Sequence, residues 1–291
     1  MKRVLLFWVV CVVCAGTHAQ LLWEVSGNGL PYKSYLFGTH HLAPVGYLDS
    51  IHGVYRAFNA CRAVVGEVVV NDPALYKKMT DGARMPNYVT MRELFSDADY
   101  MRVDSALRSV LGLGLTELAG LKPAMIESLY VMEIYRQLSP TQSDDWQLDS
   151  FFQQVAEQKN IPILGLETVD EQIALLYNSQ TLQRQAFLLV GAVEQSGRAA
   201  DELAALNRLY RQGDLDGLLA LYDSDTTRYA PTKQEKFGML DERNDAWARK
   251  LPDLMQTRPC FVAVGALHLA GDNGLVALLR KAGYKVRPVK K

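Results

Sequence analysis

Signatures of several common enzyme classes are missing from this 291-residue chain. It has no G-x-S-x-G turn, no P-loop, no H-E-x-x-H helix and no G-x-G-x-x-G motif. These absences argue against a serine hydrolase of that type, a P-loop nucleotide hydrolase, a zincin protease and a Rossmann dehydrogenase. Cysteine is scarce, with four residues. The only Cys-x-x-Cys spacing, Cys11 and Cys14, lies in the apolar N-terminal run, and none occurs in the rest of the chain. A thiol-redox centre or a cysteine-zinc site is therefore not indicated.

Long apolar runs and long basic runs are also missing. The most apolar segment, residues 4–15, falls short of the roughly 20 residues that a membrane-spanning helix needs. No cluster of Lys and Arg stands out, so we expect neither a nucleic-acid partner nor an anionic membrane partner. With 49% hydrophobic residues, the chain has ample apolar side chains for a packed core.

The N-terminus has the pattern of a secretory signal peptide. Lys2 and Arg3 precede the apolar run, and Thr17-His18-Ala19 ends it with a small residue. We therefore predict a signal peptide over residues 1–19, cleavage after Ala19, and an exported protein that is periplasmic or secreted. Loss of the two basic residues would change the formal charge from −1 to −3.

The four cysteines decide whether a lipid anchor or a disulfide is expected. Cys11 and Cys14 each follow a valine rather than a small residue, which argues against a lipid anchor. After cleavage Cys61 and Cys260 remain. Export permits a disulfide between them, but two buried free thiols are the favoured interpretation.

The pattern of apolar residues predicts one α/β domain over residues 20–291. Turn residues between 22–26 and 35–38 indicate a hairpin, and the β-branched run 63–70 indicates a strand covered on both faces. Residues 72–160 and 169–250 are mainly helical in pattern, and the tail indicates strand, helix and strand. The predicted fold is a central mixed, largely parallel sheet with a large helical insertion layer.

Two Gly-x-x-His motifs follow apolar strands at opposite ends of the chain. Gly38 stands three residues before His41, and Gly265 stands three before His268. Ligands of open α/β sheets lie beyond the carboxyl ends of strands, and glycine allows the sharp turn that aims a side chain into such a cleft. Two imidazoles that converge with a carboxylate would suit a divalent metal such as Mn, Co or Zn.

Glu67 is the leading carboxylate, because it is set within the apolar run 63–70. An unpaired charge there would be costly, so we expect Glu67 to bind the metal, to act as a base or to form a structural ion pair. Glu167 follows another strand, where stabilising the next helix is its alternative role. Arg243 could clamp an oxyanion, pair with a buried carboxylate or form a solvated ion pair.

The ordered set of motifs resembles the TraB/PrgY/GumN family, which is related to the Tiki proteins and more distantly to the erythromycin-esterase and ChaN-like group. The resemblance spans nearly all of the chain after the leader. It rests on Leu22-Trp23, residues 35–41, the Glu67 strand, Leu121-Lys122-Pro123, residues 165–168 with Glu171-Gln172, Arg243-Asn244 with Trp247, residues 264–269, Gly271 and Gly283-Tyr284.

The resemblance implies an active site of His41, His268 and Glu67, with Arg243 in a supporting or catalytic role. Gly38, Gly265, Glu167 and Asn244 would support it. Tiki members are described as metal-dependent proteases, which implies metal-assisted hydrolysis of a peptide or small-molecule substrate. His40 stands where the family often has an apolar residue, which leaves open whether it joins the metal.

Two functional hypotheses follow. The first is an exported metal-dependent hydrolase, with peptides as candidate substrates and with His41, His268 and Glu67 at the metal. The second is a non-catalytic protein that binds a peptide signal, haem or iron in the same cleft.

Overall fold

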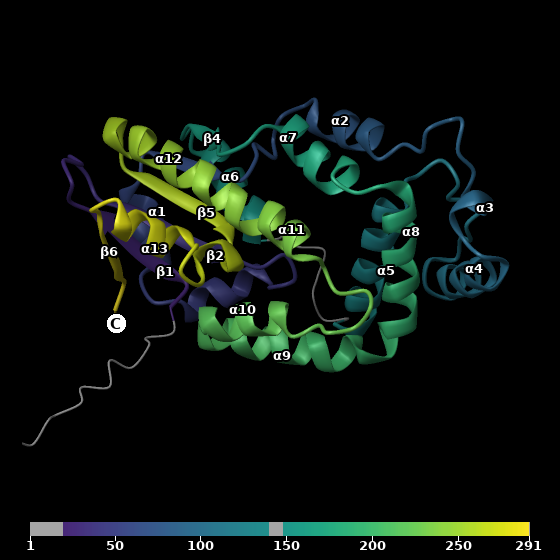
Figure 1. Ribbon diagram of the computed structural model, residues 1–291. Helices are drawn as coiled ribbons and strands as arrows, with labels where there is room; N and C mark the ends of the chain where they lie inside the picture. Colours follow the sequence, from purple (N-terminus) through teal and green to yellow (C-terminus); the bar gives the residue numbers. More distant parts are fainter. Residues whose placement is uncertain (1–19, 140–147, 291) are drawn as a thin grey trace, which may run out of the picture.

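A computed structural model describes residues 20–139 and 148–290 (Figure 1). The predicted signal peptide lies outside these residues. Within them, no helix combines the length and the apolar character that crossing a membrane requires.

A six-stranded mixed sheet forms the centre of the fold, in the order β4-β3-β5-β2-β1-β6. Strands β2 and β5, β5 and β3, and β3 and β4 pair in parallel, whereas β1 is antiparallel to both of its neighbours. This confirms the predicted mixed, largely parallel sheet. The strands are β1 (Leu22–Ser26), β2 (Ser34–Thr39), β3 (Ala63–Gly66), β4 (Ile163–Gly165), β5 (Cys260–Gly265) and β6 (Lys285–Pro288).

The predicted hairpin is confirmed, since β1 and β2 are joined by a turn in which residues 27–29 all have positive φ. The final strand β6 runs in the same direction as β5, as expected, but β2 and β1 lie between them. The strand predicted over 63–70 ends earlier, at Gly66. Just beyond this point the side-chain amide of Gln153 takes the place of a neighbouring strand. Its Nε2 donates a hydrogen bond to the Val68 carbonyl, and its Oε1 accepts one from the Val70 N–H. These backbone groups therefore need no partner in the sheet. Glu67 therefore follows the strand instead of lying inside it.

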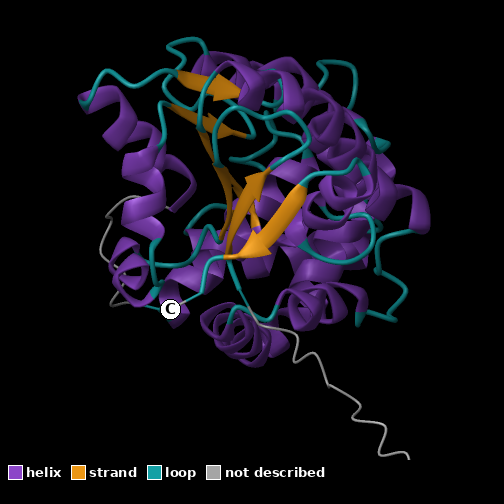
Figure 2. Cartoon of the chain, turned by 90° about the vertical axis from the view of Figure 1, so that its left-hand side faces the viewer, coloured by secondary structure: helices purple, strands orange, loops and turns teal. Residues whose placement is uncertain are grey.

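Helices cover both faces of the sheet (Figures 1 and 2). On one face α1 (Val54–Ala60) and α6 (Leu148–Gln158) bring Phe58 and Phe152 against Phe37 and Phe261 of the sheet, with ring centroids 4.6–6.0 Å apart. Such aromatic pairs add to the free energy gained by burying their apolar area. On the other face lie α12 (Glu242–Thr257) and α13 (Leu275–Lys281), which pack on each other.

A second hydrophobic core lies in the helical layer, on the right of Figure 1. Buried Leu107, Ile126 and Leu189 belong to this core and come from α4 (Asp97–Leu111), α5 (Pro123–Leu138) and α8 (Leu182–Gln195). The remaining members of the layer are α2 (Leu75–Gly82), α3 (Met91–Leu94), α7 (Val169–Ile173), α9 (Ala199–Gln212), α10 (Leu215–Asp223) and α11 (Lys233–Lys236).

The helical layer is tied back to the sheet through α9. The Tyr210 hydroxyl donates a hydrogen bond to the backbone carbonyl of Gly38 at 2.8 Å. At Gly38 the chain also passes close to Ala266, because a Cβ added to this glycine would lie 3.0 Å from the Ala266 Cα. The glycine of the first Gly-x-x-His motif is thus explained by a close approach to the turn of the second motif.

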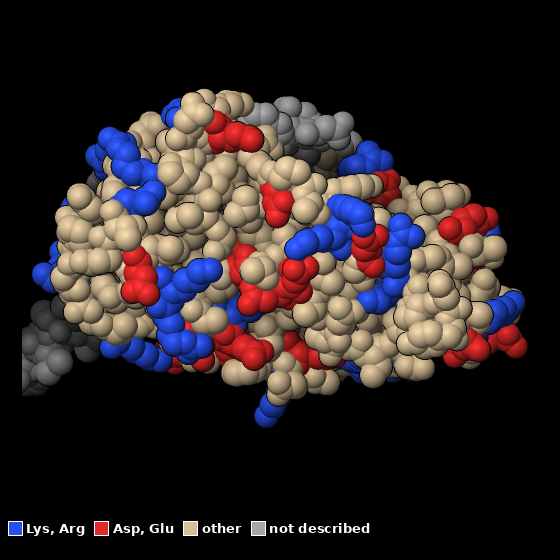
Figure 3. Space-filling view, turned by 90° about the horizontal axis from the view of Figure 1, so that it is seen from above, with Lys and Arg blue, Asp and Glu red and all other residues tan. Residues whose placement is uncertain are grey.

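Opposite charges alternate on the face of the molecule seen from above (Figure 3). One such exposed pair links Lys78 of α2 to Asp170 of α7 at 2.8 Å. Pairs of this kind contribute about 0–1 kcal/mol each, so the two cores carry most of the stability. Cys61 and Cys260 are buried free thiols, which confirms the favoured interpretation, and burial raises the pKa of Cys61 to about 12.

Candidate active site

Three polar side chains meet where adjacent strands of the sheet end. Glu67 follows β3, Glu167 follows β4 just beyond Leu166, and His268 lies in the 3-10 turn η5 (Ala266–Leu269) that follows β5. Because these strands are parallel neighbours, their carboxyl ends meet at one edge of the sheet. The first turn of α12 brings Arg243 to the same edge.

Arg243 is the centre of this cluster. Its Nε and Nη2 donate to the two carboxylate oxygens of Glu167 at 3.0 and 2.7 Å, and Nη2 also donates to Glu67 at 2.6 Å. Nη1 donates to His268 Nε2 at 3.1 Å and to the Met239 carbonyl at 3.2 Å. These contacts use all five N–H groups of a guanidinium. Arg243 is therefore a buried, fully bonded guanidinium and not a solvated ion pair.

The ring of Trp247 packs one turn further along α12. The guanidinium carbon of Arg243 lies 4.5 Å from its ring centre, and the imidazole of His268 lies 4.4 Å from it. Arg243 and Trp247, four residues apart, lie on one face of α12. A cation over an indole face is held by the ring quadrupole, so the tryptophan restrains the guanidinium of Arg243 and also packs against the imidazole of His268.

Burial and charge set the protonation of Glu67 and His268. Burial alone would raise the pKa of Glu67, but the His268 imidazole, the Arg243 guanidinium and the Gly265 N–H together hold it below its ordinary value. Burial lowers the pKa of His268 to about 4. At neutral pH the site therefore holds an ionised carboxylate beside a neutral imidazole.

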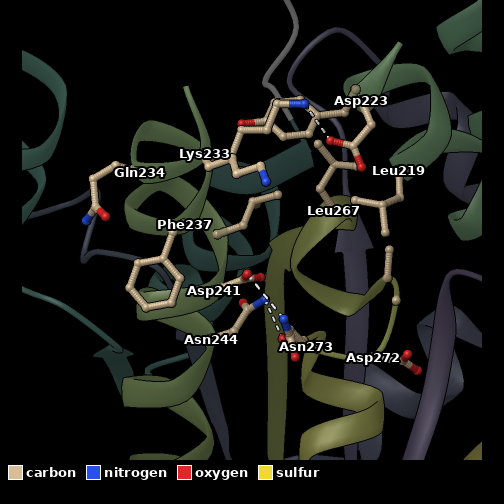
Figure 4. A pocket seen from close by; sticks show the side chains of 15 residues that line it. Leu219, Asp223, Lys233, Gln234, Phe237, Asp241, Asn244, Leu267, Asp272 and Asn273 are labelled. Atoms are coloured by element: carbon tan, nitrogen blue, oxygen red, sulfur yellow. Dashed lines mark hydrogen bonds and ion pairs between the residues drawn. The ribbon is translucent and has the colours of Figure 1, made fainter. Parts of the chain in front are cut away.

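Asn244 determines which nitrogen of His268 carries the proton. Its Nδ2 donates to the backbone carbonyl of Asn273 at 2.9 Å, an interaction drawn in Figure 4 at the wall of a neighbouring cavity of about 580 Å³. Asn244 Oδ1 then faces His268 Nδ1 at 2.7 Å and accepts a hydrogen bond from its N–H. Nε2 is consequently left with a lone pair, which points to Arg243.

We expect the substitution Asn244→Asp to raise the pKa of His268 by about one unit or more. The aspartate keeps an oxygen toward Nδ1 and adds a negative charge beside the imidazole, which favours the protonated ring. Nitrogen-15 NMR of labelled histidine measures the change, with the exposed His52 as an internal control that should not respond. An unchanged His268 titration would show that Asn244 does not contact the ring.

A π-helical turn, η4 (Phe237–Asp241), leads directly into the helix that carries Arg243. The Met239 carbonyl of this turn accepts a hydrogen bond from Arg243 Nη1 at 3.2 Å. A second π-helical turn, η2 (Ala174–Asn178), contributes Leu175 and Leu176 to the larger cavity that Arg243 lines. Single π-helical turns inside helices occur frequently at functional sites.

The cluster forms part of the wall of a cavity of about 750 Å³ between the sheet edge and the helical layer. Glu67, Arg243 and His268 line it together with both histidines of the first motif, His40 and His41. His41 is exposed and His40 is half-buried. The two Gly-x-x-His motifs, 227 positions apart in sequence, therefore open onto one cavity.

The predicted metal ligands fit a divalent ion in part. Glu67 Oε1 and His268 Nε2 lie 3.8 Å apart, which two ligands at about 2.0–2.2 Å from one ion can span. In the part of the chain that the structure describes, however, no three His, Cys, Asp or Glu side chains are close enough to hold an ion together. An ion on Nε2 would also have to replace the bond from Arg243, because that nitrogen has one lone pair.

The family model for the TraB/PrgY/gumN family matches residues 21–288. The chain belongs to this family. It is 25% identical to a Danio rerio protein named Metalloprotease TIKI2. The alignment is 322 positions long and covers 92% of this chain and 60% of the relative. A Xenopus tropicalis protein named Metalloprotease TIKI1 is also 25% identical, covering 92% and 61%.

The chain spans about 60% of the length of these Tiki relatives. No solved structure matches it significantly. The family resemblance inferred from the motifs is thereby confirmed, and the cluster described above gives its motif residues a common location.

Tyr210 is a cavity residue that the sequence did not indicate. Its ring lies 5.1 Å from that of His40, and its hydroxyl holds the Gly38 carbonyl. It lies 172 positions from Gly38 in sequence, within a helix that has no motif of its own. Only the folded chain brings this residue to the site.

Proposed function

We propose that this protein is an exported, metal-dependent hydrolase that cleaves peptide bonds in the cavity at the carboxyl edge of the sheet. The observation that carries the proposal is the pair formed by Glu67 and His268. An ionised carboxylate and the lone pair of a neutral imidazole lie 3.8 Å apart, and both face a cavity large enough for a peptide. The similarity to proteins named metalloproteases supports the same assignment.

In this proposal His268 and Glu67 would hold the divalent ion, and His41, which lines the same cavity, would have to move closer to them to become the third ligand. When bound, such an ion polarises the substrate carbonyl and activates water for attack. Asn244 keeps the proton on His268 Nδ1, so the Nε2 lone pair would be available to an ion that replaces the hydrogen bond from Arg243. The Glu67 oxygens each accept one hydrogen bond, from Gly265 and from Arg243, and each keeps a second lone pair to bind an ion or accept a proton.

Arg243 and Glu167 act through the other residues. The bidentate contact with Glu167 fixes the guanidinium. The guanidinium keeps Glu67 ionised and does not itself contact the substrate. The polar residues Glu67, Arg243 and His268 line the cavity at the sheet edge. The opposite, helical side is largely apolar, with Leu206, Leu218 and Leu221 among its residues. Such walls bind apolar side chains and reduce the access of bulk water.

Cleavage of a mixed peptide library, followed by mass spectrometry, tests the proposal. The protein should cleave peptides with added Mn²⁺, Co²⁺ or Zn²⁺ and should stop when the ion is removed by a chelator. His268→Ala and His41→Ala should each lose the activity, whereas the matched control His52→Ala, an exposed histidine, should retain it.

Two results would contradict this function. Cleavage that persists in His268→Ala would place the reaction elsewhere. Stable binding of the metal without cleavage of any peptide would favour a binding protein over an enzyme.

A further inference from the structure

A smaller cavity adjoins the main one on the side of the helical layer. It has a volume of about 270 Å³ and shares Tyr135, Gln195, Glu202 and Asp225 with the lining of the main cavity. A space of this size suits a single side chain rather than a length of peptide. Its position beside the main cavity is where a side chain of a bound substrate would enter.

The walls of this side pocket are apolar, apart from a few polar groups. They come from α5, α8, α9 and the segment 225–231, and they include Val131, Ile134, Leu188, Ala192, Ala199 and Pro231. Walls of this kind pack well against the aliphatic stem of a lysine or an arginine, whose charged end then needs a carboxylate.

Glu127 of α5 supplies a carboxyl group to the pocket. No described side chain or backbone group donates a hydrogen bond to it, whereas the other two acids of the pocket are occupied. Glu202 pairs with Arg198 at 3.2 Å, and Asp225 accepts the Thr227 N–H at 2.8 Å. The nearby Arg184 is engaged by Glu235 and by the Ala230 carbonyl.

Glu127 is half-buried, and a carboxyl group that is largely withdrawn from water and lacks a donor is costly to ionise. Burial raises the pKa of Glu127 to about 7, and the distant charge of Arg184 opposes this only in part. A cationic group that entered the pocket would stabilise the ionised form. Glu127 thus has the chemistry of a binding residue whose partner comes from outside the chain.

We propose that the side pocket at Glu127 receives a basic side chain, arginine or lysine, of the peptide substrate. This assignment rests on the proposed peptidase function and adds a preference for basic residues to it. It requires only that the substrate pass through the main cavity with one side chain directed toward α5.

Equilibrium binding tests the pocket without any need for cleavage. Nα-acetyl-arginine N-methylamide is compared by calorimetry with its citrulline analogue, which has nearly the same shape and no charge. The arginine compound should bind about 10-fold more tightly or better, because hydrogen bonds between ionised partners are the stronger ones. In Glu127→Gln this preference should fall below about 2-fold.

Glu133→Gln is the matched control, since Glu133 lies on the same helix outside the pocket and pairs with Arg136. It should retain the full preference for arginine. Thermal melting of each variant verifies that it is folded. Equal binding of the two compounds by the wild-type protein, or a preference unchanged in Glu127→Gln, would overturn the proposal.

The dependence of binding on pH gives a second test. Binding of the arginine compound should strengthen as pH rises from 5 to 8 in the wild-type protein, because Glu127 ionises in that range, and should change little in Glu127→Gln. The other charged or titratable groups near Glu127 are Tyr135, Arg184, Glu202, Asp225 and Tyr229. A slope that persists in the variant would assign the effect to one of them.

The library experiment separates this inference from the proposed function. Preferred binding of arginine without cleavage of any peptide would contradict the peptidase and leave the pocket assigned. Cleavage that shows no preference for basic residues would contradict the pocket and leave the peptidase assigned.

Discussion

Replacing Arg243 by methionine is expected to lower the free energy of unfolding by about 3–5 kcal/mol at pH 7. The side chains of Arg243 and Glu167 are only 12% and 8% exposed, and Glu67 is close by. Removing the guanidinium leaves two buried carboxylates facing each other without a cation. Urea unfolding monitored by tryptophan fluorescence measures the loss.

Arg84→Met is the matched control for this substitution. Arg84 is 68% exposed and pairs with Asp81 at the surface, so its loss should cost about 0–1 kcal/mol. Equal losses in the two variants would mean that the buried ion pairs contribute no more than a surface pair does.

Acidification should reduce the difference between wild-type protein and Arg243→Met. In the wild-type protein the pKa of Glu67 is held below its ordinary value, so its stabilising contribution is present at pH 7 and is lost as pH falls through the folded-state pKa. In the variant, burial without the cation raises the pKa of Glu67, and protonation relieves the penalty. The stability gap should therefore narrow between pH 7 and pH 4.

Glu67→Gln is expected to reduce kcat/KM for a cleaved peptide by about 10²–10⁴-fold, the range expected for loss of a general base. The amide keeps the size of the side chain and an oxygen for the Gly265 N–H, so the protein should remain folded. It removes the negative charge needed to bind a cation or accept a proton. Steady-state kinetics with a peptide identified from the library give the measurement.

Glu167→Gln is the comparison that distinguishes Glu67 from its neighbour. Glu167 contacts Arg243 and no reacting group, so its loss should have a smaller effect, about 10–100-fold, as for residues that orient a site from behind. Equal losses of kcat/KM in the two variants would mean that Glu67, like Glu167, only positions Arg243 and takes no direct part in the reaction.

The sequence predicted the strands better than the long-range contacts that end them. The β-branched runs that became β3 and β5 and the turn between β1 and β2 are local signals, so they could be predicted. The early end of β3 at Gly66 depends on Gln153, a side chain 85 positions from the Val68 carbonyl that it bonds. No local pattern contains that information.

The candidate site shows the same division. The repeated Gly-x-x-His motif indicated which residues belong together, and the cavity unites them. The partners of Arg243 could not be predicted, because they lie 76 and 176 positions away in sequence. Glu127 carried no signal at all, since a single glutamate on an amphipathic helix is usually solvated and its burial depends on α8 and α9.

The central claim is that the Nε2 lone pair of His268 is a metal-binding group at the carboxyl edge of the sheet. Pulsed electron paramagnetic resonance of the Mn²⁺-loaded protein tests it directly, because it detects nitrogen bonded to the ion. The account predicts an imidazole nitrogen coupling that is lost or reduced in His268→Ala and unchanged in His52→Ala. A bound Mn²⁺ whose nitrogen coupling is the same in His268→Ala, or is absent in the wild-type protein, would contradict it.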